Sequence, residues 1–119
     1  MTEQDQASEC LFCKIAARDI PADIVHESDS LVGFRDINPK APTHILLIPK
    51  EHVTSAATTD DHGALLGEIV QAAARLAHAE GIDSSGWRLV TNVGPDAGQS
   101  VPHLHFHLLG GRRMSWPPG

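Results

Sequence analysis

The sequence predicts an α+β fold in which a five-stranded antiparallel sheet is accompanied by two helices. Short apolar runs follow one another with short connections, which favours antiparallel pairing because parallel strands need long crossovers. One longer segment, 64–79, carries its apolar residues at helical spacing. Near the C-terminus, residues 103–108 alternate strictly between histidine and apolar side chains, as in a strand that buries one face.

The first half of the chain is expected to contain a short helix and three strands. The helix must end before Pro21, because the residue that precedes a proline avoids the helical conformation. Ser28–Ser30 are expected to form a tight turn, which makes the first two strands a hairpin. A proline-bearing loop then leads into the third strand. The expected bounds are 9–18 for the helix and 23–28, 31–36 and 44–50 for the strands.

The second half is expected to form a long helix and two further strands. The residues TTDD, at 58–61, offer side chains that can cap the N-terminus of the helix, and Gly81 suits its C-terminal end. A strand at 86–93 and a small polar loop at 94–100 then lead into the histidine-containing strand. The helix is expected to bury Leu65, Leu66, Ile69, Val70, Ala73, Leu76 and Ala77.

The bulk composition limits the partners of the protein. Its 119 residues carry a formal net charge of −6, so binding to nucleic acid is not expected, although backbone N–H groups can still hold a small nucleotide. No apolar run approaches the roughly 20 residues that span a membrane. The length predicts one domain at 10–119, behind a polar, disordered tail at 1–9 that is unlike a signal peptide. A cytoplasmic location is therefore expected.

Three histidines alternate with apolar residues at His103, His105 and His107. Successive side chains of a strand point to opposite faces, so the imidazoles are expected on one open face, within reach of a ligand. In a straight strand His103 and His107 lie about 13 Å apart, too far for one metal ion to bind all three rings. The alternative is a solvated strand face that is merely rich in histidine. The expected core residues of this strand are Leu104, Phe106 and Leu108.

Imidazole can act as a nucleophile, a general acid/base or a metal ligand. Attack on phosphorus needs a free ring nitrogen and donors around the phosphate oxygens. His105 lies between two other imidazoles and is the expected nucleophile. The loop 94–100 leads into the same strand, where its backbone N–H groups and the Ser100 hydroxyl could hold an anion. The alternative is that this loop is a plain turn.

These segments together resemble the histidine triad (HIT) family. HLHFHLL is similar to the family signature His-x-His-x-His-x-x, in which x is apolar. FRDINPKAPTHILLIPKEH is similar to the family's first nucleotide-contacting segment, and GQSV and LGGR–M–WPPG resemble its nucleotide-binding phosphoramidase branch. The resemblance covers Phe12–Gly119. It implies a homodimer in which two five-stranded sheets join into one ten-stranded sheet.

The resemblance also implies a role for individual residues. His105 would be the nucleophile that forms a covalent nucleotidyl-histidine intermediate, and His107 would hydrogen-bond the phosphate. The backbone carbonyl of His103 would orient the His105 ring, and Ser100 would lie near the leaving group. The other implied nucleotide contacts are Asp36 at the ribose, Asn92 and Gln99 beside the phosphate, Phe12, Ile15, Phe34, Ile37 and Leu46 around the base, and Trp116 reaching across the dimer.

Alternatives exist for several of these residues. The apolar ones would belong to an ordinary core in any case, Asp36 could be a turn residue, and Trp116 could lie in a disordered tail. Ser115 stands where some relatives of this branch carry another histidine, which leaves the leaving-group preference open. The physiological substrate and the base preference are also open.

Cys10 and Cys13 form a C-x-x-C pair, which suits metal or redox chemistry better than a structural disulfide in a chain without signs of secretion. An inert buried pair is the alternative, and the lack of a βαβ pattern argues against a thioredoxin-like role. Bacterial relatives with both cysteines resemble zinc proteins. This resemblance implies a structural Zn²⁺ bound by Cys10, Cys13, His44 and His103, with no open position for catalysis and no catalytic cofactor.

The expected function is hydrolysis of nucleoside 5′-phosphoramidates or acyl-nucleotides, with a purine nucleotide as ligand and a nucleoside monophosphate as product. A pure binding module has no need for a histidine at position 105, which argues for an enzyme. Two alternatives are a non-catalytic nucleotide-binding or interaction protein and a dinucleoside polyphosphate hydrolase. The GQSV and WPPG segments favour the phosphoramidase branch over the latter.

Overall fold

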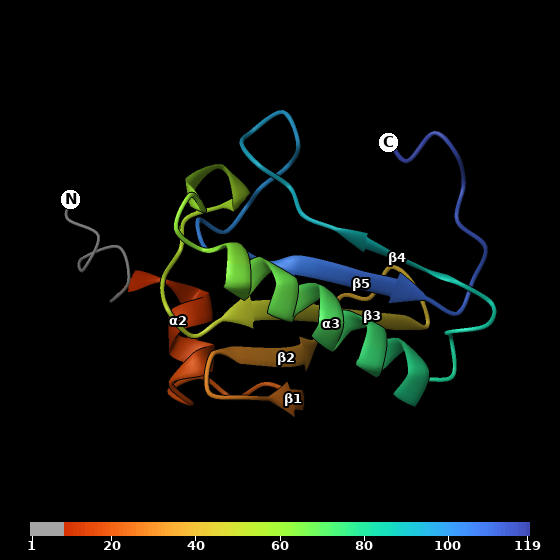
Figure 1. The fold of residues 1–119 in the computed structure, drawn as a ribbon, viewed down its shortest axis with the longest axis horizontal. Helices are drawn as coiled ribbons and strands as arrows, with labels where there is room; N and C mark the ends of the chain where they lie inside the picture. The colour runs from red at the N-terminus through yellow and green to blue at the C-terminus, as the bar shows by residue number, and fades with distance from the viewer. Residues whose placement is uncertain (1–8) are drawn as a thin grey trace.

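The computed structural model describes residues 9–119, so the predicted tail at 1–9 lies, apart from Glu9, outside the described residues. The five strands form one antiparallel sheet in the order β1-β2-β3-β5-β4 (Figure 1). The predicted α+β class, with a five-stranded antiparallel sheet, is therefore confirmed. The elements are α2 (Leu11–Ala16), β1 (Ile24–Glu27), β2 (Leu31–Arg35), β3 (Thr43–Pro49), the short 3₁₀ helix η1 (Ala56–Thr58), α3 (Gly63–Ala79), β4 (Trp87–Val90) and β5 (Phe106–Gly110).

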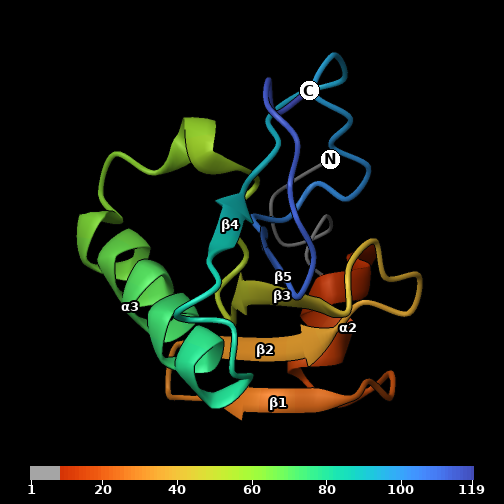
Figure 2. The same ribbon diagram turned by 90° about the vertical axis from the view of Figure 1, so that its right-hand side faces the viewer.

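The long helix α3 covers one face of the sheet (Figure 2). Its buried stripe packs on β3 and β5, where Ile45 and Leu108 are fully buried, and burial of such side chains stabilises the fold by roughly 1.5–3 kcal/mol each. The side chain of Arg35 in β2 binds both carboxylate oxygens of Glu80 at the end of α3, at 2.8 and 3.0 Å. This ion pair ties the helix to the sheet. The buried residues of α3 are Ile69, Ala72, Ala73, Leu76 and Ala77.

Two details of α3 differ from the sequence prediction. Val70 is 48% exposed, because it lies about 100° around the helix from Ile69, at the edge of the buried stripe. The N-cap residue is His62, whose side chain makes no capping hydrogen bond to the described residues, so the expected cap from 58–61 is wrong. The Thr58 side chain instead completes the capping box of η1. Gly81 has a positive φ of 74° directly after the helix, as expected.

The other face of the sheet is covered at one end by the short helix α2. Phe12 and Ile15 of α2 are buried there against Phe34 and Leu46 of the sheet. The prediction of an open face for the histidines therefore needs correction, since His103 is 0% and His105 is 5% exposed. The rings lie under α2 and the segments beside it. The candidate site lies on this face, from the region beneath α2 to the region around β4 and β5 that α2 leaves uncovered.

The histidine segment is a strand only in its second half. β5 begins at Phe106; residues 101–103 form a bend, and residues 104–105 connect it to the strand. Leu104 and Leu108 are buried in the α3 core, and Phe106 packs partly against it, so the predicted alternation of the apolar residues is confirmed. The His103 ring lies beside the sulfurs of Cys10 and Cys13, whereas the rings of His105 and His107 contact each other. Within residues 9–119, neither helix is long and apolar enough to cross a membrane.

Candidate functional site

Strand pairing assembles one row of side chains across four strands on the α2 face of the sheet. Phe34 of β2 pairs with Leu46 of β3, Leu46 pairs with His107 of β5, and His107 pairs with Val90 of β4. Directly paired residues lie side by side on the same face. The row therefore runs from an apolar wall beneath α2 to the last histidine of the triad.

An apolar cavity of about 280 Å³ opens at the α2 end of this row. All five residues predicted to surround a base line it, and four of them are also buried core residues. Ile37 differs, because it is fully exposed and stands at the rim. An apolar cavity with polar groups only at its edge suits a flat, largely apolar ring. The five residues are Phe12, Ile15, Phe34, Ile37 and Leu46.

A second, more polar cavity of about 310 Å³ lies at the other end of the row. Asn92, His44 and His107 line it, and Asp36 lines both cavities. One Asp36 oxygen accepts a hydrogen bond from the Asn38 backbone N–H at 2.8 Å. The structure thus brings Asp36 and Asn92 to the same site as His107, with the carboxylate at the junction of the apolar and polar halves.

The His105 ring is held in one orientation by the backbone. Its Nδ1–H donates to the carbonyl oxygen of His103 at 2.7 Å, so in the neutral ring Nε2 carries the lone pair. The edge-to-face contact with Phe12 has ring centroids 5.0 Å apart, and the His107 ring lies 5.1 Å away on the other side. A buried imidazole with one nitrogen anchored and the other free has the arrangement that a nucleophile requires.

Burial favours the neutral form of His107 and His44. Burial lowers the pKa of His107 to about 4, and repulsion from His105 and His44 adds to this effect. Burial also lowers the pKa of His44, against the opposing attraction of Asp36. The His44 Nε2 lies 2.9 Å from the His107 Nδ1 and 3.5 Å from an Asp36 oxygen. His44 therefore belongs to this polar cavity.

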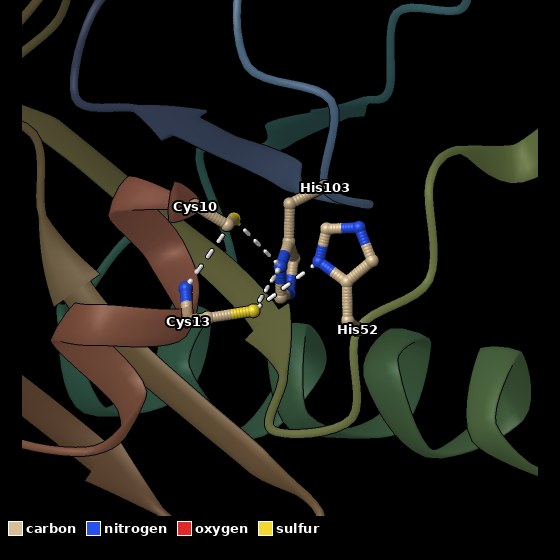
Figure 3. A group of neighbouring side chains, drawn as sticks. All are labelled: Cys10, Cys13, His52 and His103. Atoms are coloured by element: carbon tan, nitrogen blue, oxygen red, sulfur yellow. Dashed lines mark hydrogen bonds between the residues drawn. The ribbon is translucent and has the colours of Figure 1, made fainter. Parts of the chain in front are cut away.

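The two cysteines lie with two histidines in a separate cluster (Figure 3). The His103 Nδ1 is 3.3 Å from the Cys10 sulfur and 3.4 Å from the Cys13 sulfur, and the His52 Nδ1 is 3.2 Å from the Cys13 sulfur. All four donor atoms lie within 4.8 Å of one another. They come from the start of α2, the segment after β3 and the bend before β5. We refer to Cys10, Cys13, His52 and His103 as the cysteine cluster.

Three residues of the predicted ligand set, Cys10, Cys13 and His103, lie together, whereas His44 lies elsewhere and His52 occupies the place assigned to it. The strand register gives the reason. His44 pairs with Leu109, which puts it at the opposite end of β3 from the segment that faces His103. Leu47 pairs with Phe106, so the chain just after β3 lies opposite His103. No sequence pattern indicates His52, because the register between β3 and β5 is known only from the structure.

The donor set of the cysteine cluster fits a tetrahedral zinc ion. The His103 Nε2 donates to the Pro49 carbonyl at 2.9 Å, which leaves its Nδ1 lone pair directed at both sulfurs. Burial, together with the hydrogen bond from neighbouring Cys10, raises the pKa of the Cys13 thiol to about 12. A buried thiol pair with this property ionises when a cation compensates the charge. Two sulfurs and two imidazoles are the ligands that structural zinc prefers.

The small polar loop closes on itself through Gln99. Its side-chain oxygen accepts from the Gly94 N–H at 3.0 Å, and its amide nitrogen donates to the carbonyls of Thr54 and Val101 at 2.9 and 3.1 Å. The amide is thus already engaged by the backbone and anchors the loop to the chain after His52. Ser100 is exposed beside it, and Trp116 is 80% exposed in the C-terminal segment.

Comparison with known proteins places this fold and site in a family. The HIT domain family matches residues 17–114, which is most of the chain. The chain belongs to the HIT family. A solved HIT family hydrolase from Legionella pneumophila Philadelphia 1 is 53% identical to this HIT protein, with a TM-score of 0.91 over 93% of this chain and 100% of that chain.

Two further relatives of this HIT protein have informative names. A 14 kDa zinc-binding protein from Zea mays is 47% identical over 115 residues, which cover 94% of this chain and 89% of the maize protein. A solved histidine triad nucleotide-binding protein from Candida albicans is 31% identical, with a TM-score of 0.79 over 92% of this chain and 83% of that one.

Proposed function

We propose that this HIT protein is a nucleotide hydrolase that cleaves nucleoside 5′-phosphoramidates or acyl-nucleotides through a covalent nucleotidyl-histidine intermediate. The observation that carries the proposal is the 2.7 Å hydrogen bond from the His105 Nδ1–H to the His103 carbonyl. It fixes the proton on Nδ1 and leaves Nε2 as the nucleophilic nitrogen. The name of the Legionella relative as a hydrolase supports the same function.

The bound nucleotide would extend along the row of side chains described above. The base lies in the apolar cavity, the ribose hydroxyls bind Asp36 at its edge, and the phosphate lies over His105 and His107. Asp36 supports this order because it borders both cavities. Asn92, Ser100 and the backbone of the loop closed by Gln99 would contact the phosphate and leaving group. The Candida relative is named as a nucleotide-binding protein, which fits this arrangement.

The reaction would proceed in two displacements. The His105 Nε2 forms a bond to the α-phosphorus while the phosphorus–nitrogen bond to the amine, or the phosphorus–oxygen bond to the acyl group, breaks. A departing amine takes up one proton, whereas a departing carboxylate needs none. Water then attacks phosphorus, the Nε2–phosphorus bond breaks, and the proton released by the water balances any proton taken up by the amine. Donors around the non-bridging oxygens stabilise the charge of both transition states.

Single-turnover kinetics test this proposal. His105→Ala should lower kcat for an adenosine 5′-phosphoramidate by about 10³-fold or more, with a small change in nucleotide affinity, because only the nucleophile is lost. His78→Ala is the matched control, since the His78 side chain is 82% exposed and outside the site. A dinucleoside polyphosphate should be cleaved more slowly than the phosphoramidate. Turnover of a few per cent or more in His105→Ala, or no nucleotidyl-histidine in quenched wild type, contradicts the proposal.

We also propose that the cysteine cluster holds one structural Zn²⁺. Cys10, Cys13, His52 and His103 would bind it, and the ion would supply stability rather than take part in the reaction, because four protein ligands fill a tetrahedral site. The name of the maize relative as a zinc-binding protein supports this proposal. His103 would then have two roles: its ring would bind the metal, and its backbone carbonyl would accept the hydrogen bond from His105.

A homodimer is the proposed assembly. β4 is an edge strand of the sheet, and all four of its residues are only half-buried. Pairing of two such edges would produce the ten-stranded sheet implied by the family resemblance. It would also provide hydrogen-bond partners for the backbone groups at the edge of the sheet. The exposed Trp116 would then contact the partner subunit. Sedimentation should give twice the 12.8 kDa of the chain.

A further inference from the structure

The protonation of the His44 ring can be derived from its backbone contact. The Lys40 backbone N–H lies 3.0 Å from the His44 Nδ1 and donates to it. A backbone N–H can only donate, so Nδ1 must be the acceptor and carry no proton. The neutral ring of His44 therefore has its proton on Nε2, and the loop between β2 and β3 determines which tautomer it adopts.

The same reasoning extends one ring further. The His44 Nε2–H lies 2.9 Å from the His107 Nδ1 and donates to it, so the neutral His107 ring has its proton on Nε2. The Asp36 carboxylate, at 3.5 Å from the same His44 nitrogen, is a weaker acceptor at that distance. The His107 Nε2 makes no hydrogen bond to residues 9–119, so it is available to a ligand. The backbone amide of Lys40 thus sets, through two rings, where His107 holds its proton.

We propose that His44 is a positioning residue that fixes His107 in the Nε2–H tautomer, so that His107 presents a donor to the phosphate oxygens beside His105. The tautomer of His107 follows from the hydrogen bonds of His44. The effect of this tautomer on phosphate binding rests on the proposed function. In the other tautomer, His107 would turn a lone pair toward a negatively charged oxygen. Fixing the tautomer before the substrate arrives removes the cost of reorganising the donor.

The geometry argues against a metal ion as the alternative use of this cluster. Asp36, His44 and His107 offer three ligand atoms within 4.8 Å of one another, as a metal site would. A metal on the His44 Nε2 would move the proton of that ring to Nδ1, directly against the Lys40 N–H. Two N–H groups would then face each other at 3.0 Å, which leaves a buried donor without an acceptor. The hydrogen-bond chain satisfies both nitrogens of His44 without a metal ion.

The hydrogen-bond chain from Lys40 to His107 can be tested in two variants of His44 by ¹⁵N NMR of the histidine side chains at neutral pH. His44→Leu removes the donor to His107, whereas the amide of His44→Gln can still donate from its nitrogen. The expected result is a protonated Nε2 and an unprotonated Nδ1 on His107 in wild type and His44→Gln, and a mixture of tautomers in His44→Leu. A protonated Nδ1 in wild type, or an unchanged pattern in His44→Leu, overturns the inference. His78→Leu, at the exposed histidine, is the control.

Kinetics provide the second readout. His44→Leu should lower kcat/KM for the adenosine phosphoramidate by about 10- to 100-fold, less than the full loss of a donor, and His44→Gln should recover most of it. If His44→Leu changes the tautomer but not the rate, the positioning role is wrong. If wild type itself shows no turnover, the proposed function fails, and the tautomer measurement still decides the inference. Melting temperature and zinc content of each variant identify one that fails to fold.

Discussion

The molecule contains two clusters of histidines. They differ in the hydrogen bond made by the distal ring nitrogen, which is the imidazole nitrogen that points away from the cluster. In the cysteine cluster, the distal nitrogen of His103 donates to the Pro49 carbonyl, so the nitrogen that faces the cluster has a lone pair. In the Asp36–His44–His107 cluster, the distal nitrogen of His44 accepts from the Lys40 N–H, so the nitrogen that faces the cluster has a proton. A carbonyl that accepts from one ring nitrogen leaves a lone pair on the other, which can bind a metal. An amide N–H that donates to one ring nitrogen leaves the proton on the other, which can donate a hydrogen bond.

His103 connects the two regions. Its ring belongs to the cysteine cluster, while its backbone carbonyl holds the Nδ1–H of His105. The segment after β3 makes a second connection, because the Val53 carbonyl accepts from the Leu104 N–H and the Thr54 carbonyl accepts from Gln99. A metal that fixes His52 and His103 would thereby fix both the nucleophile and the loop beside it.

The largest expected difference between the clusters is in metal content and stability. Cys13→Ser and His52→Ala should each reduce zinc to well below one ion per chain and lower the melting temperature by about 10 °C or more, because metal binding contributes folding free energy. His44→Leu should retain a full equivalent of zinc. Elemental analysis and calorimetry of protein purified without an affinity tag measure both quantities. Zinc loss in His44→Leu, together with retention in His52→Ala, would reverse the assignment of the fourth ligand.

A smaller effect is expected at the carboxylate of the second cluster. Asp36→Asn should weaken binding of a ribonucleotide by about 10-fold and binding of its 2′-deoxy analogue by less, because a charged acceptor of two hydroxyls is lost. The zinc content should stay unchanged. Calorimetric titration with AMP and 2′-deoxy-AMP makes the comparison. Equal losses for both sugars would remove Asp36 from the ribose site.

The third effect concerns pH. Burial lowers the pKa of His107 to about 4 in the folded protein, against its ordinary 6.5, so the unfolded chain takes up this proton first. The free energy of unfolding should therefore fall as the pH drops from 6.5 toward 4, and the part due to His107 should stop changing below that range. Between pH 6.5 and 4, the free energy of unfolding of His107→Gln should fall by about 1–2 kcal/mol less than that of wild type. This figure allows for the partial exposure of the ring. Urea unfolding at several pH values measures the difference, and parallel curves for the two proteins would contradict it.

Much of this arrangement follows from sequence pattern. The alternation of Leu104 and Leu108 with histidines predicted the buried side of β5, and the C-x-x-C pair predicted a cluster near the start of the chain. These patterns are local, so a period or a spacing suffices. The position of His52 beside His103 depends instead on the register between β3 and β5, which pairs residues that are far apart in the sequence, such as Leu47 with Phe106.

The hydrogen-bond chain from Lys40 through His44 to His107 could not be predicted from any sequence pattern. It depends on the backbone amide of Lys40, and any residue type other than proline supplies such a group. The bend before β5 likewise required the structure, since HLHFHLL alone indicates a continuous strand with three equivalent histidines. The three are in fact different: His103 is buried in the cysteine cluster, His105 is anchored to the backbone, and His107 is the acceptor of His44.

The most direct test of the difference between the two clusters is a crystal structure of untagged protein, with anomalous diffraction recorded on both sides of the zinc absorption edge. We expect one anomalous peak per chain, surrounded by Cys10, Cys13, His52 and His103. No peak should lie among Asp36, His44 and His107, even after soaking in excess zinc at neutral pH. A peak in the second cluster, or a zinc ion bound by His44, would contradict the account.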